Sequence, residues 1–191
     1  MHWLGLAAVG VLLAAIGGIL AISAGLTDPT PAVLPTRSIA LEPLSLPATA
    51  EQINWLVAES AASYLTIRLT AAWESGDPDA AYGLVLGEPN RYLAAAVSAT
   101  GYISLWLYEG DRVHYLLPWQ TWTHVQAGAA GNEIQIERQE HRIIVRINRE
   151  QLWTGSYPVA GTQIGVVAQS FNDPTTIRFE QLQIMSQPAE E

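Results

Sequence analysis

The apolar run at residues 4–26 constrains this chain more than any other feature. It contains 23 consecutive residues without a charged side chain, and Ser23 is its only polar one. A helix rises about 1.5 Å per residue, so this run would extend about 34 Å and cross a hydrocarbon core about 30 Å thick. The sequence therefore predicts a transmembrane helix in residues 1–26, with the rest of the chain beside the bilayer.

A cleaved signal peptide is the main alternative to a retained anchor. Such a peptide has a basic start, an apolar core of about 7–15 residues and a cleavage site of small residues. Residues 1–3 supply no lysine or arginine, and the apolar run is longer than that core. Ala21-Ile22-Ser23 would be a weak cleavage site, so cleavage stays open while we favour the anchor.

A stripe of small residues follows one side of the predicted helix, because its members recur three or four positions apart. They are Ala7, Gly10, Ala14, Gly17, Ala21 and Ala24, and Gly10, Ala14 and Gly18 also form a ladder with a small residue at every fourth position. Small side chains let helices approach closely in lipid. We therefore expect this helix to contact the lipid bilayer and to pack against other transmembrane subunits.

The sidedness of the span is weakly encoded. No lysine or arginine precedes the run, and the first one after it is Arg37. The positive-inside bias therefore has little charge to act on. A single N-terminal span followed by an exported domain is the usual arrangement. We expect a single-pass protein of the cell membrane with its C-terminal domain on the extracytoplasmic side.

The charge of the whole chain excludes several kinds of partner and chemistry. The net charge is −9, and nine arginines supply every fixed side-chain cation because there is no lysine. An acidic protein is repelled by nucleic-acid phosphates, so we expect no nucleic-acid partner. The absence of cysteine excludes disulfides, thiol catalysis and thiolate metal sites.

Three segments follow the anchor. Residues 27–50 hold five prolines, which favour an extended linker, and their leucines suggest that part of it lies along a surface. Residues 51–187 show short alternating runs separated by turn residues, which predict an all-β antiparallel sandwich or barrel. Residues 50–62 are the only helical candidate, with a weak signal, and residues 123–127 are one of the predicted strands. Residues 188–191 form an acidic tail.

Five motifs carry a resemblance to a known superfamily. They are Tyr82-Gly83-Leu84-Val85-Leu86, Gly101-Tyr102-Ile103-Ser104-Leu105, Trp122 with Gly128, Asn132, Ile134 and Ile136, then Ile143, Val145, Ile147 and Asn148, and finally Ile164-Gly165-Val166 with Ile177, Phe179, Glu180, Gln181, Leu182 and Ile184. In these residues the chain resembles the bacterial extracytoplasmic domains of the concanavalin A-like lectin/glucanase superfamily. The resemblance implies a jelly-roll β-sandwich and no particular chemistry, since these are fold motifs. Arg149 departs from the family, which usually has a glycine after Asn148.

One strand is the sharpest candidate for catalysis. Strand alternation places Glu133, Gln135 and Glu137 on one face. Glucanases of the superfamily cleave with a Glu-x-Asp-x-Glu strand, and Gln135 stands where their central aspartate would be. We therefore favour a solvated strand face, and we predict no catalytic residues.

Loop carboxylates offer a weak alternative for calcium. Asp77, Asp79, Asn172 and Asp173 could supply oxygen ligands, but such residues are more often turn formers. We expect no metal and no cofactor. Arg138, Arg142, Arg146 and Arg149 lie beside several glutamates, which predicts cross-strand ion pairs, with an acidic docking partner as the alternative.

An aromatic strip is the most specific surface feature of the predicted β domain. In residues 102–108 the even positions include Tyr102, Trp106 and Tyr108, while the odd positions are aliphatic. The aromatic residues that follow are Tyr115, Trp119 and Trp122. Tyrosine and tryptophan combine an apolar ring with a polar tip, which suits a sugar or a peptide. We take Tyr102, Trp106, Tyr108, Tyr115 and Trp119 as candidate binding residues. The alternative is that these rings cover the sheet or pack under the linker.

These observations favour a non-catalytic interaction module that acts as an accessory or assembly subunit of a membrane or envelope complex. Two alternatives stay open. The first is a carbohydrate-binding module at the cell surface, with carbohydrate as a further partner. The second is a glycoside hydrolase, against which the glutamine at position 135 speaks.

Overall fold

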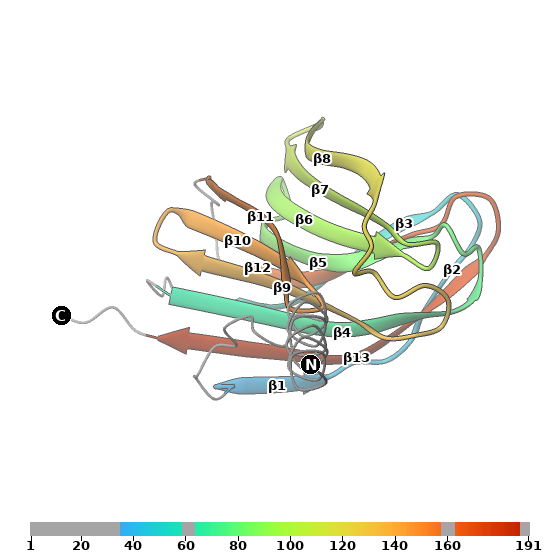
Figure 1. The fold of residues 1–191 in the computed structure, drawn as a ribbon, viewed down its shortest axis with the longest axis horizontal. Helices are drawn as coiled ribbons and strands as arrows, with labels where there is room; N and C mark the ends of the chain where they lie inside the picture. Colours follow the sequence, from blue (N-terminus) through green and yellow to red (C-terminus); the bar gives the residue numbers. More distant parts are fainter. Residues whose placement is uncertain (1–34, 59–63, 158–162, 188–191) are drawn as a thin grey trace, which may run out of the picture. The chain divides into compact units, whose positions relative to one another are not determined.

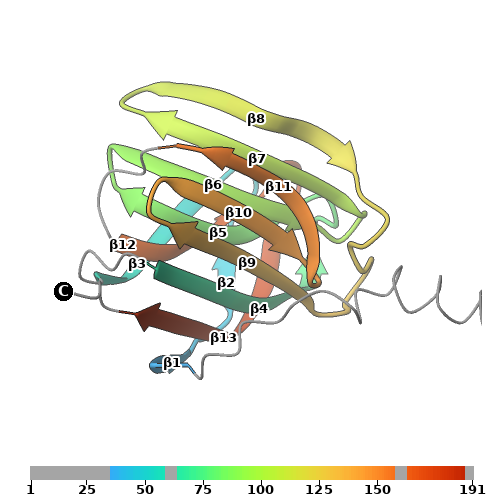
Figure 2. The ribbon, with the colours of Figure 1, turned by 60° about the vertical axis from the view of Figure 1, so that its left-hand side comes forward.

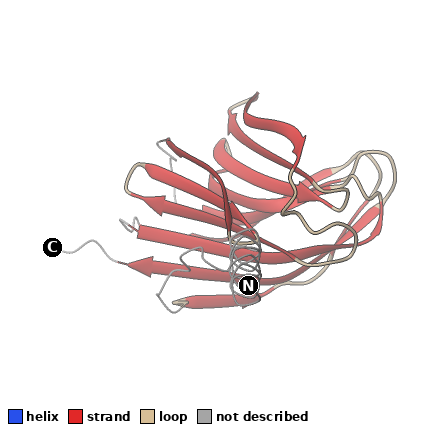
Figure 3. Ribbon diagram, viewed as in Figure 1, coloured by secondary structure: helices blue, strands red, loops and turns tan. Residues whose placement is uncertain are grey.

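The computed structural model describes residues 35–58, 64–157 and 163–187. Within these ranges the chain forms strands and connecting loops and no helix (Figure 3). None of the described residues therefore belongs to a helix that is long and apolar enough to span a bilayer. The predicted transmembrane segment, its stripe of small residues and the acidic tail lie outside the described residues.

Two antiparallel sheets pack as a sandwich (Figures 1 and 2). Sheet A contains β1 (Arg37–Ala40), β2 (Leu44–Leu46), β4 (Tyr64–Gly76), β9 (Asn132–Gln139), β10 (Arg142–Ile147), β11 (Glu150–Ser156) and β13 (Thr175–Gln187). Its order is β1-β13-β4-β9-β10-β11, and β2 also pairs with β13. Every one of these pairings is antiparallel, in agreement with the all-β expectation.

Sheet B contains β3 (Glu51–Ala58), β5 (Ala81–Glu88), β6 (Arg91–Ser98), β7 (Tyr102–Glu109), β8 (Arg112–Thr121) and β12 (Gln163–Gln169). Its order is β3-β12-β5-β6-β7-β8. The four strands from β5 to β8 follow one another in the chain and in space, joined by short turns (Figure 2). Residues close in sequence therefore build most of one sheet face.

One hydrophobic core fills the space between the sheets. Leu65, Ile67 and Leu69 of β4 are fully buried, and they belong to the same cluster as Leu84 and Leu86 of β5. Side chains alternate across a strand, so the residues between them face outward. The outward faces differ: that of sheet A is rich in polar residues, whereas that of sheet B carries a second apolar cluster.

The sandwich begins earlier in the chain than residue 51. Ile39 of β1 pairs with Leu182, and Ser45 of β2 pairs with Thr176, so both strands extend sheet A. Pro43 and Pro47 flank β2 and do not interrupt it, as expected for proline at strand ends. Part of the predicted linker 27–50 thus lies along the domain as sheet strands, where we expected extended chain along a surface.

Two local predictions are wrong. Residues 51–58 form β3 and not the start of a helix, because they pair along their length with β12. Their β-branched and aromatic side chains, such as Ile53, Trp55 and Val57, favour a strand over the weak helical signal. Residues 123–127 form a loop between β8 and β9 and not a strand.

Two asparagines connect that loop to the β10–β11 turn. The side-chain oxygen of Asn132 accepts hydrogen bonds from the Gln126 amide and the Asn148 amide group, each at 2.8 Å. Asn148 also accepts one from the Glu133 backbone at 2.7 Å. Asn148 and Arg149 have φ of 52° and 76°, so an Asn-Arg pair makes a turn for which Asn-Gly is usual.

Candidate functional site: an aromatic face on sheet B

The outer face of sheet B carries side chains of unequal size. Ala94 and Ala96 on β6 lie opposite Trp106 and Ser104 on β7. Tyr92 lies opposite Tyr108 at the end of the same strand pair. Small and aromatic side chains are therefore neighbours on this face, and Tyr92 and Trp106 are only 6% and 8% exposed. The apolar cluster on this face extends through Val85 and Val167 to Trp55, Trp119 and Phe171.

Irregular pairing between β7 and β8 orients the rings. Leu105 pairs with Leu117, whereas the next residue, Trp106, pairs with Tyr115, so β8 contains an extra residue there. Leu116 and Leu117 consequently both pack against the main core. Tyr115 remains on the outer face, beside Trp106. Trp119 also lies on this face, with its ring centroid 6.5 Å from that of Trp106.

The first of two hollows on this face is the platform hollow. It has a volume of about 230 Å³ and is lined on one side by Trp106, Tyr108, Tyr115 and Trp119, together with Tyr92 and Val113. Glu51 of β3 and Gln169 of β12 line the other side. These two residues are direct partners in the β3–β12 ladder. The hollow therefore combines aromatic rings with a carboxylate and an amide.

The second is the loop hollow, which has a volume of about 280 Å³. Its lining residues are Asp79, Ser98, Thr100, Tyr102, Trp119 and Phe171. The Thr100 hydroxyl donates a hydrogen bond to Asp79 Oδ1 at 2.8 Å, and its oxygen lies 2.9 Å from that of Ser98. This chain of polar groups fixes Asp79 at the edge of the hollow. Trp119 lines both hollows.

Ring contacts hold the floor of the platform hollow in place. Tyr92 and Tyr108 stack with centroids 4.9 Å apart, and Trp55 meets Tyr92 edge-on at 5.9 Å. Aromatic pairs in these geometries gain about 0.5–1.5 kcal/mol beyond the area they bury. The rings are thus oriented before any ligand arrives.

Two titratable groups of the platform hollow have raised pKa values. Partial desolvation raises the pKa of the Glu51 carboxyl. Burial, the nearby Glu51 carboxylate and Tyr108 together raise the pKa of Tyr92 to about 12. A phenol is protonated near neutral pH with or without this shift, so Tyr92 can donate a hydrogen bond.

A buried aspartate supports the loop hollow from below. Asp77 is 3% exposed; its Oδ2 accepts hydrogen bonds from the amides of Phe171 and Asn172, and its Oδ1 accepts one from Asp79. Burial opposes ionisation, but these amide hydrogen bonds outweigh it and lower the pKa of Asp77. The carboxylate thus ties the β4–β5 turn to the β12–β13 loop, which positions Asp79 and Phe171.

The structure places all five predicted binding residues on this face. Tyr102 is 40% exposed and lines the loop hollow, while Tyr115 is 56% exposed and lines the platform hollow. Trp122, which follows the strip in the sequence, packs against the main core with its indole nitrogen buried and without a hydrogen bond.

Two residues that face these rings, Glu51 and Gln169, were not predicted from the sequence. Glu51 was hidden in the weak helical candidate, and Gln169 lies at the end of a strand whose partner was unknown. Tyr92 could have been found, because the alternation of Tyr92, Ala94 and Ala96 places it on the same face as the strip.

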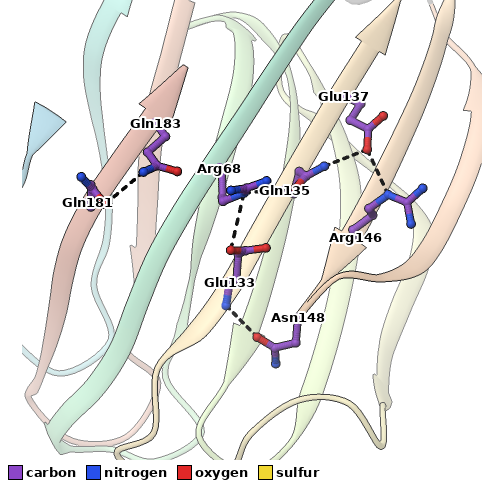
Figure 4. A network of polar contacts seen from close by, with 8 residues as sticks. All are labelled: Arg68, Glu133, Gln135, Glu137, Arg146, Asn148, Gln181 and Gln183. Atoms are coloured by element: carbon purple, nitrogen blue, oxygen red, sulfur yellow. Dashed lines mark hydrogen bonds and ion pairs between the residues drawn. The ribbon is translucent and has the colours of Figure 1, made fainter. Parts of the chain in front are cut away.

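The glutamates predicted to form a solvated face are instead part of a compact polar network on sheet A (Figure 4). Gln135 and Glu137 are only 3% and 5% exposed. Glu137 Oε1 accepts hydrogen bonds from Gln135 at 2.7 Å and from Arg146 at 2.9 Å. Arg68 of β4 and Arg146 of β10 lie beside Gln135 and Glu137 of β9 and shield them from water. Strand alternation alone does not predict this burial.

Cross-strand ion pairs were predicted for the arginines of the β9–β10 hairpin, and Arg146–Glu137 is one. Arg68 of β4 adds a contact to Glu133 at 3.5 Å. Arg138 does not share that face: it is 8% exposed, and burial lowers its pKa. Among the described residues, no group of three or more His, Asp or Glu side chains is arranged to hold a metal ion.

No protein-family model matches the sequence, and no curated protein matches it. Several solved structures share the fold. The carbohydrate-binding module CBM66 from Bacillus subtilis is similar at 12% identity and a TM-score of 0.59, over 80% of this chain and 94% of that one. The galectin LEC-6 from Caenorhabditis elegans is similar at 10% identity and a TM-score of 0.52, over 77% and 94%.

A Bacillus licheniformis β-glucanase is also similar, at 9% identity and a TM-score of 0.53, over 76% of this chain and 78% of that one. At these identities the similarity shows the fold alone. The domain therefore shares the antiparallel jelly-roll β-sandwich fold of these structures.

Proposed function

We propose that this domain binds carbohydrate on the outer face of sheet B and does not cleave it. The observation that carries the proposal is the set of six Tyr and Trp side chains that line two hollows sharing Trp119. Sugar rings have apolar faces and hydroxyl edges, so they suit aromatic platforms flanked by polar groups. Glu51 and Gln169 in one hollow and Asp79 in the other supply those polar groups.

The arrangement of carboxylates supports binding without hydrolysis. Retaining glycosidases use two carboxyl groups about 5–5.5 Å apart, and inverting ones use a pair somewhat further apart, flanking one bond. Each hollow on sheet B is lined by a single carboxylate, Glu51 or Asp79. The glutamates of β9 lie on the other sheet, where Glu137 is engaged by Arg146.

The structural neighbours are compatible with carbohydrate binding, but they do not distinguish binding alone from binding with cleavage. They include a carbohydrate-binding module and a galectin, but also a β-glucanase. A fold shared by binding modules and hydrolases leaves the function to the side chains of the site. Those side chains favour binding here, because the outer face of sheet B offers rings and single carboxylates.

A glycan array probed with the full chain in mild detergent tests the proposal. We expect binding to a restricted set of glycans and its loss in a Tyr115→Ala/Trp119→Ala double variant. Tyr64→Ala, a substitution of the same kind at the start of β4 in sheet A, should bind as the unaltered chain does. The absence of any glycan signal, or an equal signal from the double variant, would contradict the proposal.

An accessory or assembly role in a membrane complex is the second candidate. Its support comes from the small-residue stripe in residues 7–24, together with a face that exposes Tyr102, Val113 and Tyr115. Such a role is compatible with glycan binding by an extracytoplasmic domain on a single-pass anchor. Native purification in mild detergent followed by mass spectrometry tests it: stable co-purifying membrane subunits are expected, and a free monomer would contradict it.

A further inference from the structure

The two hollows adjoin at one shared side chain, and we treat them together as an extended site. Trp119 lines the platform hollow and the loop hollow, and its ring lies next to that of Trp106. Volumes of about 230 and 280 Å³ each lie below the range of about 300–1,000 Å³ that is typical of small-molecule pockets. Together they fall within it, so a ligand that fills the site must pass Trp119.

The charges of the extended site have one sign. Among the residues that the structure describes, Glu51 and Asp79 are the two carboxylates of the site, and no arginine or histidine lines either hollow. The hydroxyl of Thr100 holds Asp79, which leaves the second carboxylate oxygen as an acceptor with no hydrogen bond recorded in the described part of the chain. A carboxylate accepts hydrogen bonds from neighbouring hydroxyls but repels another carboxylate or a sulfate.

We infer that the ligand is an uncharged, linear oligosaccharide whose consecutive units occupy the platform hollow and the loop hollow on either side of Trp119. This inference rests on the proposed function and adds the length and charge class of its ligand. Tyr108 and Tyr115 contact the units in the platform hollow, and Tyr102 contacts those in the loop hollow. Glu51 and Asp79, which lie toward the same end of sheet B, accept hydroxyl hydrogen bonds and reject acidic glycans.

Calorimetric titration of the full chain with matched oligosaccharides tests length and charge separately. The neutral probes are malto-, cello-, laminari- and xylo-oligosaccharides from monosaccharide to hexasaccharide. The acidic probes are oligogalacturonides and heparin-derived oligosaccharides of the same lengths. We expect affinity for one neutral series to rise at least about tenfold from the disaccharide to the longest chain, and acidic chains to bind at least about tenfold more weakly.

Three variants locate the effects within the site. Tyr102→Ala should abolish the gain from chain length while short chains still bind. Trp119→Ala should weaken short and long chains alike. Glu51→Gln removes one of the two carboxylates, so it should weaken the binding of neutral chains, improve the binding of acidic ones and narrow the difference between the two classes by at least about fivefold. Thermal unfolding of each variant, compared with the unaltered chain, separates a loss of binding from a loss of folding.

The outcomes distinguish this inference from the function on which it rests. A disaccharide that binds as tightly as the longest chain would overturn the extended site, and tight binding of an acidic chain would overturn the charge class, while glycan binding itself would stand. If no probe of either class binds, the proposed function fails and the inference fails with it.

Discussion

The rings of Tyr92 and Tyr108 stack at a centroid distance of 4.9 Å with an interplanar angle of 16°. The two residues are cross-strand partners on β6 and β7, so backbone pairing sets their separation. Trp55 of β3 meets Tyr92 edge-on, at an angle of 73°. Three strands thus contribute to one rigid aromatic floor, which lies on the outside of the sandwich, away from its main core.

Substitutions of buried and of exposed tyrosines on this face should have different effects on the stability of the domain and on glycan binding. Tyr108 is half-buried in the stack, so Tyr108→Ala should lower the free energy of unfolding by about 1–3 kcal/mol. Tyr115 is 56% exposed, so Tyr115→Ala should change it by less than about 0.5 kcal/mol. Tyr115→Ala should nevertheless weaken glycan binding by about tenfold. Urea unfolding and calorimetric titration measure the two effects, and an unchanged affinity would remove Tyr115 from the site.

The β10–β11 turn offers a pair of substitutions with opposite expected signs. Arg149 has φ of 76°, which glycine adopts without strain, so Arg149→Gly should stabilise the domain by about 0.5–1 kcal/mol. Its backbone carbonyl, which accepts a hydrogen bond from Arg146, is retained.

Asn148→Gly is the control, because φ is 52° there but the side chain hydrogen-bonds to three residues. It should destabilise the domain by about 1–3 kcal/mol. Urea midpoints of the two variants are to be compared. Equal shifts in the same direction would show that backbone strain and side-chain hydrogen bonds are not the deciding terms in this turn.

Low pH should weaken the hydrogen bonds by which Asp77 connects the β4–β5 turn to the β12–β13 loop. The folded pKa of Asp77 lies below its unfolded value of 3.8. Its contribution to stability is therefore complete above that unfolded value and is lost as pH falls through the folded pKa. Asp77→Asn should cost about 1–3 kcal/mol at neutral pH, since an amide NH₂ would face backbone donors.

The difference between Asp77→Asn and the unaltered chain should shrink as the pH falls below about 4, because the unaltered chain then loses its carboxylate as well. Urea unfolding across this pH range measures it. A difference that stays constant with pH would show that the charge of Asp77 does not support the loops.

The ion pair on sheet A should behave as a buried pair. The side chains of Glu137 and Arg146 are 7% and 11% exposed. Removing one partner leaves an uncompensated charge, so Glu137→Leu or Arg146→Met should each cost about 3–5 kcal/mol. The double variant should lose less than either single one. A double-mutant cycle by urea unfolding tests this, and additive losses would contradict the coupling.

The sheets could be predicted from the sequence to different extents. The strands from β5 to β7 and β12 were found because long alternating runs and turn residues mark them. β1 and β2 were missed because they are short and lie among prolines, and their order depends on pairing with β13, which is distant in the chain. β3 was taken for a weak helix because its conformation depends on pairing with β12, which is also distant in the chain.

The binding face was predictable in part. Alternation over residues 102–108 was enough to place Tyr102, Trp106 and Tyr108 on one side of a strand. The opposing Glu51 and Gln169 required knowledge that β3 and β12 join the same sheet. Trp122 follows the strip in the sequence but was not assigned to it, and it packs against the core because the chain leaves β8 at Thr121.

Tryptophan indole signals test glycan binding on sheet B most directly. The chain has seven tryptophans, and Trp106 and Trp119 line the hollows, whereas Trp73, Trp122 and Trp153 pack against the main core. NMR spectra of the full chain, with signals assigned by Trp→Phe substitution, are recorded as a neutral oligosaccharide is added. The account predicts saturable shifts at Trp106 and Trp119 and none at the three core tryptophans. Shifts confined to the core tryptophans, or no shift at any concentration across the neutral series, would contradict it.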